Sequence, residues 1–301
     1  MERLARVVAA LCVLVALTTT AAAEPALSPS APVPTRDQRG GPPLEWRWAK
    51  FSTLDYVLTL GGAGMTLAGS ILKPRSEHSL TGGIWFDEDA RDALRQDDAQ
   101  SRYIFRDASD VGLSLAVTWP FFADSLVTAW WYRGSRDVAE QMALIDLQTL
   151  AVVGAIHSTT TNLVSRERPF GRTCGSSEMP DAALDCEGSF HHRSFFSGHA
   201  AFSFTGAALI CVHHMKQELL GPPWDAVSCA TGYAVAATTA TFRMVADVHY
   251  ASDVMTGALI GTLFGYGIPL LHYQTRPDSD HLGLKLQLVP AAGGLGVAGA
   301  F

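Results

Sequence analysis

Six long apolar segments, separated by polar or charged stretches, dominate the chain between residues 56 and 271. Each is roughly 17–22 residues long, about the length that a helix needs to cross the hydrocarbon core of a bilayer. The pattern predicts an all-α fold, a six-helix bundle, within residues 51–275. Glycines at positions 257, 261 and 265 also predict close contact between the last helix and a neighbour. The segments are Tyr56–Leu72, Val111–Tyr132, Ala143–Val164, one that begins at Ser197, Ala226–Val245 and Val254–Leu271.

The stretches outside these segments predict smaller elements. Within the charged stretch Arg75–Asp110, residues Ile84–Asp98 predict an acidic surface helix. In the C-terminal tail, residues 276–301, four leucines between positions 282 and 288 alternate with other residues at a period of two. With the turn-forming residues that follow, this alternation predicts a short β-hairpin.

The N-terminus has the parts of a secretory signal peptide. Two arginines precede the apolar run Val7–Leu17, and Ala21–Ala23 supplies small residues for cleavage before Glu24. The sequence therefore predicts a signal peptide at residues 1–23, with an uncleaved anchor helix as the alternative. Residues 24–50, which begin with a stretch rich in Pro, Ser and Ala, predict a flexible linker.

Composition and charge narrow the class of protein. Of the 301 residues, 48% are hydrophobic and 17% charged, yet the mean hydropathy is only +0.15. A net charge of -7 argues against nucleic acid as a partner, because no basic stripe is available to neutralise phosphates. If the segments cross a membrane, Asp124 and Asp146 must face the bundle interior. We expect membrane association, with a soluble bundle in the cell envelope as the alternative.

Export implies an oxidising compartment, in which cysteines can pair. Cys174 and Cys186 lie in one polar loop and predict a disulfide, whereas Cys211 and Cys229 lie in apolar helices and predict buried free thiols. The disulfide conflicts with a cleaved signal peptide followed by three spans, because that topology places Arg168 in a reducing compartment. Either the N-terminal segment is retained, one segment does not span, or the bundle is soluble.

Three polar clusters lie at the ends of the predicted helices. Arg166–Pro169 follows the third helix, Ser197–His199 begins the fourth, and Arg243, His249 and Asp253 join the fifth to the sixth. Helices that alternate in direction bring these three ends to one face of a bundle. The sequence therefore predicts one site built from three distant parts of the chain.

The residue types in these clusters suit an oxyanion. Ser197 is a favourable N-cap, Gly198 lets a ligand approach the backbone, and the free N–H groups of the first turn favour negative charge. His199 can give or take a proton near neutral pH. The guanidinium groups of Arg168 and Arg243 match phosphate oxygens in a bidentate way.

His249 and Asp253 lie four residues apart and share one face if that stretch is helical. The carboxylate can then accept a hydrogen bond from the imidazole Nδ1–H. This bond would fix the tautomer and leave Nε2 free as a nucleophile.

These motifs, in this order and at helix ends, resemble those of the type 2 phosphatidic acid phosphatase superfamily, which also includes bacterial acid phosphatases and vanadium haloperoxidases. The resemblance covers roughly residues 56–273. It implies a phosphatase that needs no metal or cofactor and that vanadate inhibits. His249 would attack phosphorus and form a phosphohistidine, while His199 would protonate the leaving group and then activate water. The groups that would hold the phosphate oxygens are Arg168, Arg243, Ser197 and the Gly198 N–H.

Two positions depart from the family pattern. Thr161 stands where the family has a lysine, and Phe196 stands where it usually has a proline. Arg166 or Arg193 could replace the missing charge, so Arg166 and Thr161 are possible phosphate-binding residues. Otherwise the chain is a slow enzyme or a catalytically impaired phospholipid-binding or structural bundle. A vanadate-dependent haloperoxidase is a third reading.

The expected substrate is a phosphate monoester or a diphosphate. A bundle in the membrane favours a lipid phosphate, and a soluble bundle favours a small phosphate ester. In either case we expect an exported protein whose active site faces the periplasm or the exterior.

Overall fold

The structure is a computed structural model that describes residues 42–72, 80–174, 186, 190–274, 285–291 and 294–300. The signal peptide predicted at residues 1–23 and the linker as far as residue 41 lie outside the described residues.

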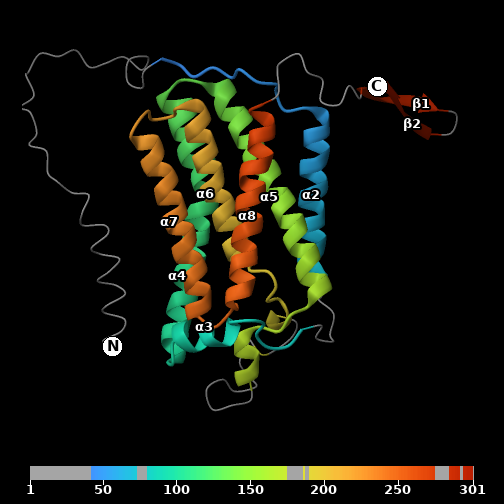
Figure 1. The fold of residues 1–301 in the computed structure, drawn as a ribbon. Coiled ribbons are helices and arrows are strands. Elements are labelled where there is room, and N and C mark those ends of the chain that lie inside the picture. Colours follow the sequence, from blue (N-terminus) through green and yellow to red (C-terminus); the bar gives the residue numbers. More distant parts are fainter. Residues whose placement is uncertain are drawn as a thin grey trace, which may run out of the picture. The chain divides into compact units, whose positions relative to one another are not determined.

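Six long helices run side by side and alternate in direction along the chain (Figure 1). This is the all-α bundle that the six apolar segments predict. The second long helix, α4, continues into a π-helical stretch, Pro120–Tyr132. The helices are α2 (Thr53–Ile71), α4 (Ala99–Trp119), α5 (Arg136–Val164), α6 (Gly198–Gln217), α7 (Trp224–Val245) and α8 (Ala251–His272).

Local capping determines where these helices begin and end. The side chains of Ser52 and Asp55 each accept a hydrogen bond from the other's backbone N–H, a capping box that begins α2. Ser197 caps α6 by accepting a hydrogen bond from the Ala200 N–H. At the end of α5, Ser165 has a left-handed φ of 48° and turns the chain out of the helix. The end of α5 and the start of α6 thus lie at the same end of the bundle.

Helix α6 is central, because it packs against α4, α5, α7 and α8. Helix α8 approaches it through the three glycines at positions 257, 261 and 265, as their spacing predicts. A Cβ atom at Gly261 would lie 2.1 Å from the Ala201 carbonyl oxygen, and one at Gly257 would lie 2.5 Å from that of Ser197. Side chains at these glycines would force α8 away from the turn that begins α6.

Helix α3 (Asp87–Leu94) lies across the end of the bundle where α6 and α8 begin, and it packs against α7 and α8 (Figure 1). It falls within Ile84–Asp98, where the sequence predicts an acidic surface helix, but it is shorter. The prediction of a surface helix is wrong at its first residue, because Asp87 is only 1% exposed. Asp87 is buried because Arg166 and Ser252 bind its carboxylate.

The four cysteines that follow Cys12 in the sequence form two disulfides. The predicted Cys174–Cys186 bond is confirmed. The prediction of free thiols at Cys211 and Cys229 is wrong, since these residues form a second disulfide between α6 and α7 with a Cα–Cα distance of 4.5 Å. Their register depends on how the two helices pack, which the apolar character of each segment does not reveal.

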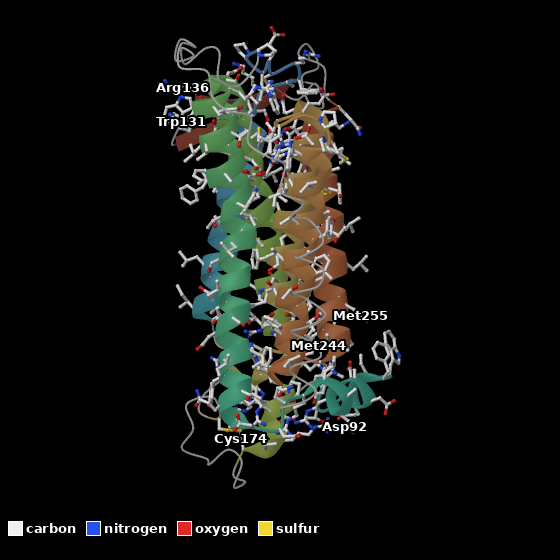
Figure 2. The ribbon with its side chains drawn as sticks, turned by 90° about the vertical axis from the view of Figure 1, so that its left-hand side faces the viewer. Asp92, Trp131, Arg136, Cys174, Met244 and Met255 are labelled. Carbon is white, nitrogen blue, oxygen red and sulfur yellow. A yellow bond between two sulfur atoms is a disulfide. The ribbon has the colours of Figure 1, made fainter. Side chains whose placement is uncertain are left out.

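Apolar side chains cover the outside of the bundle as well as its interior. Leu60 on α2 is 72% exposed and Leu259 on α8 is 66% exposed. Figure 2 shows Trp131 at the end of the bundle remote from Cys174. Among the described residues, three helices are long and apolar enough to cross a membrane: Ala99–Tyr132, Arg136–Val164 and Ala251–His272. Together these features support membrane association.

Two acidic residues inside the apolar segments, Asp124 and Asp146, face inward, as a membrane-embedded bundle requires. Asp124 is 3% exposed and Asp146 is 1% exposed. Asp124 accepts a hydrogen bond from Trp119 Nε1, and Asp146 lies 2.8 Å from His213 Nε2. The described part of the chain therefore keeps these charges away from its apolar exterior.

Residues 42–50 are packed, so the prediction of a flexible linker is wrong for this part. The side chains of Leu44 and Trp46 pack against the buried core around Met142. The Leu44 N–H donates a hydrogen bond of 2.6 Å to Ser135 Oγ, and Trp48 meets Tyr273 edge to face. These residues are ordered because their apolar side chains have a core to cover.

In the tail, β1 (Lys285–Ala291) and β2 (Gly294–Ala300) pair antiparallel, with Leu288 opposite Val297. The strands fall where the alternating leucines predict a hairpin.

Candidate active site

The turn that begins α6 is buried and has little room for side chains. Ser197 is fully buried, and its N–H donates a hydrogen bond of 3.0 Å to the Asp253 carbonyl oxygen. A Cβ atom at Gly198 would lie 2.8 Å from His157 Nε2, so only glycine fits between this turn and α5. The turn is thereby fixed against α8 on one side and α5 on the other.

His249 presents one open nitrogen to this turn. Its Nδ1 lies 2.8 Å from the Ser194 carbonyl oxygen. A carbonyl can only accept, so Nδ1 carries the proton and the lone pair of the neutral ring is on Nε2. Among the residues that the structure describes, none hydrogen-bonds Nε2.

The predicted hydrogen bond from His249 to Asp253 is replaced by this carbonyl contact. Asp253 Oδ2 is 3.7 Å from Nδ1, and it instead accepts hydrogen bonds from Ser194 Oγ at 2.6 Å and Tyr250 N–H at 3.0 Å. The carboxylate therefore positions His249 indirectly, because it holds the loop whose carbonyl binds the ring. Ser194 is a residue that the spacing of the motifs does not reveal.

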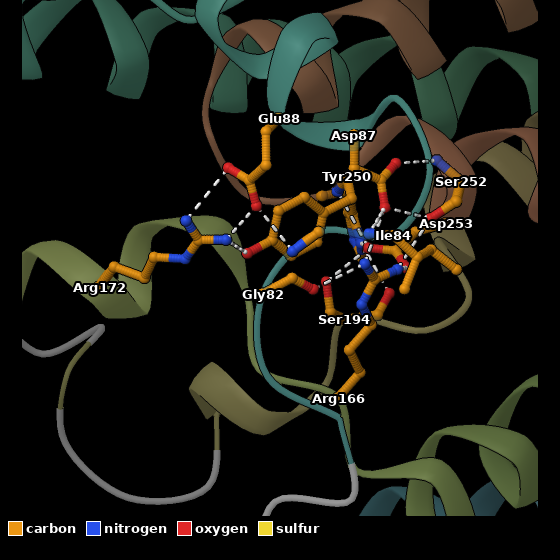
Figure 3. Close-up of polar contacts among 12 residues, drawn as sticks. Gly82, Ile84, Asp87, Glu88, Arg166, Arg172, Ser194, Tyr250, Ser252 and Asp253 are labelled. Atoms are coloured by element: carbon orange, nitrogen blue, oxygen red, sulfur yellow. Dashed lines mark hydrogen bonds and ion pairs between the residues drawn. The ribbon is translucent and has the colours of Figure 1, made fainter.

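Arg166 is part of the support behind this loop, as Figure 3 shows. Its two terminal nitrogens donate to Asp253 Oδ1 at 2.6 Å and to Asp87 Oδ2 at 2.8 Å. The guanidinium also stacks over the Tyr250 ring, 4.3 Å from its centroid, and the residue is fully buried. A buried guanidinium between two carboxylates is already neutralised.

The prediction that Arg166 binds phosphate is therefore wrong. Arg166 forms a bridge with Leu80, whereas Arg168 is followed directly by a 3₁₀ turn at Pro169–Thr173. Arg166 is thus committed to α3, and Arg168 lies close to His249.

The loop before α8 is held to α3 by further ion pairs. Arg91 donates two hydrogen bonds to Asp247, of 2.6 and 2.8 Å, and Arg95 donates one of 2.9 Å. The hydrogen bond with Asp247 raises the pKa of Arg91. Asp87 accepts from the Ser252 N–H at 2.8 Å. Residues on both sides of His249 are consequently attached to α3.

Four residues predicted for the site come together here. Arg168, Arg243 and His199 all act electrostatically on His249, which is only 4% exposed. Burial first, and then the charges of these three residues, hold the pKa of His249 well below its ordinary value. The ring is therefore neutral at pH 7, which is the form that a nucleophile requires.

Helix α4 supplies two site residues that the sequence did not point to. Asp110 Oδ1 lies 2.6 Å from His199 Nε2 and 3.4 Å from Arg243 Nη1. Ser109 Oγ accepts a hydrogen bond of 2.9 Å from Arg243 Nη1. Their only signal in the sequence is their place at the polar start of an apolar segment, next to Val111.

Thr161, at the position of the family's lysine, is buried on α5. Its hydroxyl lies 3.4 Å from His157 Nε2, and His157 in turn contacts Gly198 and hydrogen-bonds the Phe196 backbone. A histidine–threonine pair thus lies on the α5 side of this turn. The expectation that Thr161 itself binds phosphate stays a prediction.

Among the residues described, no group of three or more metal-binding side chains is placed to hold a metal ion. The expectation of a reaction without metal or cofactor stays a prediction.

Part of the chain is similar to proteins of a known family. A family model described as the PAP2 superfamily matches residues 143–277, a range that includes all three polar clusters. The lipid A 1-phosphatase of Porphyromonas gingivalis is 27% identical over 146 residues, which are 48% of this chain. The chain spans only 27% of the length of that relative.

Among solved structures, a transmembrane PAP2 type phosphatidylglycerolphosphate phosphatase from Bacillus subtilis is similar, with a TM-score of 0.45 and 18% identity. The similarity covers 75% of this chain and 98% of that one.

Proposed function

We propose that this chain, whose residues 143–277 match the PAP2 superfamily model, is a phosphatase that removes phosphate from a lipid phosphate monoester or diphosphate. The single observation that supports this most is His249, a neutral imidazole whose Nε2 is open and whose neighbours include Arg168, Arg243 and His199. A nucleophile beside two guanidinium groups suits a tetrahedral dianion.

The proposed reaction has two steps. In the first, His249 Nε2 attacks phosphorus, the bond to the leaving oxygen breaks, and His199 gives that oxygen a proton. In the second, His199 takes a proton from water, which attacks the phosphohistidine, and inorganic phosphate leaves with His249 restored. Throughout both steps the proton stays on Nδ1, which donates a hydrogen bond to the Ser194 carbonyl oxygen, and this bond stabilises the cationic phosphorylated ring.

Arg168 and Arg243 bind the equatorial oxygens in this proposal, together with the N–H groups at the start of α6. The N-terminal dipole of α6 adds to the same effect. No step is assigned to a metal ion. Burial and the charge of Arg243 lower the pKa of His199 to about 4, and Asp110, 2.6 Å from His199 Nε2, opposes them by favouring the protonated ring.

A lipid substrate follows from the exterior of the bundle. The apolar outer surface keeps the protein in a membrane, where the phosphates of lipid headgroups are the phosphate esters present at highest local concentration. The relative from Porphyromonas gingivalis is named lipid A 1-phosphatase. Which lipid this chain accepts is a question for a substrate panel.

We further propose that the active-site end faces the oxidising side of the membrane. Cys174–Cys186 lies at this end, and disulfides persist where thiols are not kept reduced. The start of α2 lies at the opposite end. A cleaved signal peptide and six complete spans are therefore incompatible with this orientation. Intact cells should hydrolyse external p-nitrophenyl phosphate at the rate of permeabilised ones; latent activity would reverse the orientation.

The test of the function uses the purified full chain in detergent with a chelator present. We expect phosphate release from phosphatidic acid and from p-nitrophenyl phosphate, and we expect inhibition by vanadate. Bromide or chloride oxidation by peroxide with added vanadate would instead favour the haloperoxidase reading. Binding of phospholipid without any release of phosphate would favour the impaired bundle.

The Thr161→Lys variant tests whether the missing lysine charge limits the rate of the enzyme. If a missing charge limits the rate, the lysine should raise kcat. An unchanged or lower rate would mean that the His157–Thr161 pair already completes this side of the site. The Thr161→Met variant, of similar length without charge, controls for the added volume.

A further inference from the structure

Three consecutive apolar residues lie exposed at the active-site end, just before α3. Ile84 is 37% exposed, Trp85 88% and Phe86 44%. Trp85 is the most exposed large apolar side chain among the described residues. A contiguous apolar patch of this kind on a protein surface marks a contact with something else.

Hydrogen bonds hold this turn in one shape. The Gly83 N–H donates to Glu88 Oε1 at 2.7 Å, and the Ile84 N–H donates to Asp87 Oδ2 at 2.9 Å. Between them, Trp85 has a φ of 54°, a left-handed conformation that is unfavourable for a bulky residue. The turn therefore keeps a large aromatic side chain exposed in a strained backbone conformation, which indicates a functional reason.

The turn cannot move independently of the catalytic loop. It leads into α3, whose Asp87 binds Arg166 and Ser252, and whose Arg91 forms an ion pair with Asp247. Whatever fixes the depth of the turn therefore fixes the depth of His249 as well.

We propose that Ile84, Trp85 and Phe86 insert into the interfacial region of the lipid leaflet on the active-site side, and so hold the phosphate site at headgroup level. Tryptophan is enriched at this level of a bilayer, where its ring is buried and its N–H remains hydrated. The patch also continues the apolar exterior of the bundle. Figure 2 shows Met255 and Met244 near α3, on the side of the bundle where Asp92 lies, and Met255 is 59% exposed.

The charges of α3 indicate which kind of lipid surface the turn would contact. Asp87 is buried against Arg166, Glu88 is paired with Arg172, and Arg91 is bound to Asp247, so the exposed charges of α3 are the carboxylates of Asp89 and Asp92. An anionic partner would be repelled, so the contact depends on the apolar side chains and should be insensitive to salt. A zwitterionic lipid surface fits this chemistry.

A fluorine NMR experiment tests the location of Trp85 directly. The full chain is labelled with 5-fluorotryptophan and placed in phosphatidylcholine nanodiscs, and Trp85→Phe identifies the resonance of residue 85. We expect a lipid with a nitroxide near its headgroup to broaden this resonance, and a water-soluble gadolinium chelate to leave it sharp. Broadening by the chelate, or protection from both agents as in a protein–protein contact, would overturn the proposal.

A kinetic experiment asks what the contact does. Trp85→Ser should raise KM severalfold for phosphatidic acid in vesicles, with kcat unchanged and with p-nitrophenyl phosphate hydrolysis unaffected. The matched change at the opposite end, Trp131→Ser, should leave both substrates unaffected. Equal KM values for Trp85→Ser and the unmodified chain would contradict the proposed role. The NMR result does not depend on turnover, so it stands apart from success or failure of the proposed function.

Discussion

Helix α6 carries histidines at both ends, and the two ends do different things. In its first turn, His199 lies among Arg168, Arg243 and Asp110. In its last turns, His213 and His214 are buried beside carboxylates. The residue types are similar, but only the first end has an excess of positive charge.

At the second end every ring nitrogen has a partner. His213 contacts Tyr273 Oη at 2.7 Å and Asp146 at 2.8 Å. His214 contacts Asp225 at 2.6 Å and Asp124 at 3.3 Å. Since carboxylates and imidazoles balance each other there, that cluster joins helices and has no capacity for a ligand.

The first end differs in two physical respects. The N-terminal dipole of α6 favours an anion, whereas the C-terminal dipole at the other end disfavours one. Furthermore, the backbone carbonyl of Ser194 takes only one nitrogen of His249 and leaves the other open. Chemistry therefore depends on which ring atoms are left without a partner, more than on the presence of histidine and aspartate.

The largest expected effect separates the two ends by turnover. His249→Gln should lower kcat on the order of 10⁴-fold or more, since it removes the proposed nucleophile, and should leave the thermal midpoint nearly unchanged. Asp146→Asn at the other end should lower the thermal midpoint and retain kcat. Both quantities are measured on the same detergent preparations. Loss of turnover in folded Asp146→Asn would show that the two ends are coupled.

The next effect concerns the support behind the site. Arg166→Met should destabilise the fold by about 3–5 kcal/mol, because Asp87 and Asp253 would remain buried without their shared counter-charge. Arg166→Lys keeps the positive charge but loses the two-pronged guanidinium. Its stability should lie between that of the unmodified chain and that of Arg166→Met. Thermal unfolding followed by circular dichroism measures this order. A stable Arg166→Met variant that loses only phosphate affinity would restore Arg166 as a phosphate ligand.

A smaller effect is expected from Asp110. Asp110→Asn should lower kcat for phosphatidic acid roughly 10- to 100-fold, a part of what general acid catalysis contributes. The loss for p-nitrophenyl phosphate should be smaller, because that leaving group needs little protonation. Asp107→Asn, an exposed change one turn away on α4, is the control. Equal losses for both substrates would argue that Asp110 does not act through His199.

The smallest effect is a shift in pH dependence. Because His249 has a lowered pKa, it stays neutral as pH falls through its ordinary value of about 6.5, so the acid limb of kcat/KM should lie below that pH. Arg168→Gln removes a positive neighbour, which should raise the pKa of His249 and move the limb to higher pH. An acid limb that does not move would show that the charge of Arg168 does not affect the pKa of His249.

Much of the fold could be predicted because hydrophobic pattern and caps are local properties. The six segments, the N-cap at Ser197 and the glycine face of α8 all follow from spacing in the sequence. The meeting of Arg168, Arg243, His199 and His249 follows from alternating helices whose ends carry the motifs. These predictions required no knowledge of side-chain packing.

What was missed depends on register between distant segments. Asp110 reaches His199 only because α4 packs beside α6, and Cys211 meets Cys229 only at one register of α6 and α7. Arg166 was misassigned because its two carboxylate partners come from α3 and α8, about 80 residues away in either direction. No local pattern contains that information.

The most direct test of the central claim is to trap the phosphorylated enzyme. Enzyme turning over a labelled substrate is quenched in alkali, digested and sequenced by mass spectrometry. We predict one phosphoryl group, stable to base and labile to acid, on the Nε2 atom of His249, and none in His249→Gln. A phosphoryl group on any other residue, or turnover without a phosphoenzyme, would contradict the proposed mechanism.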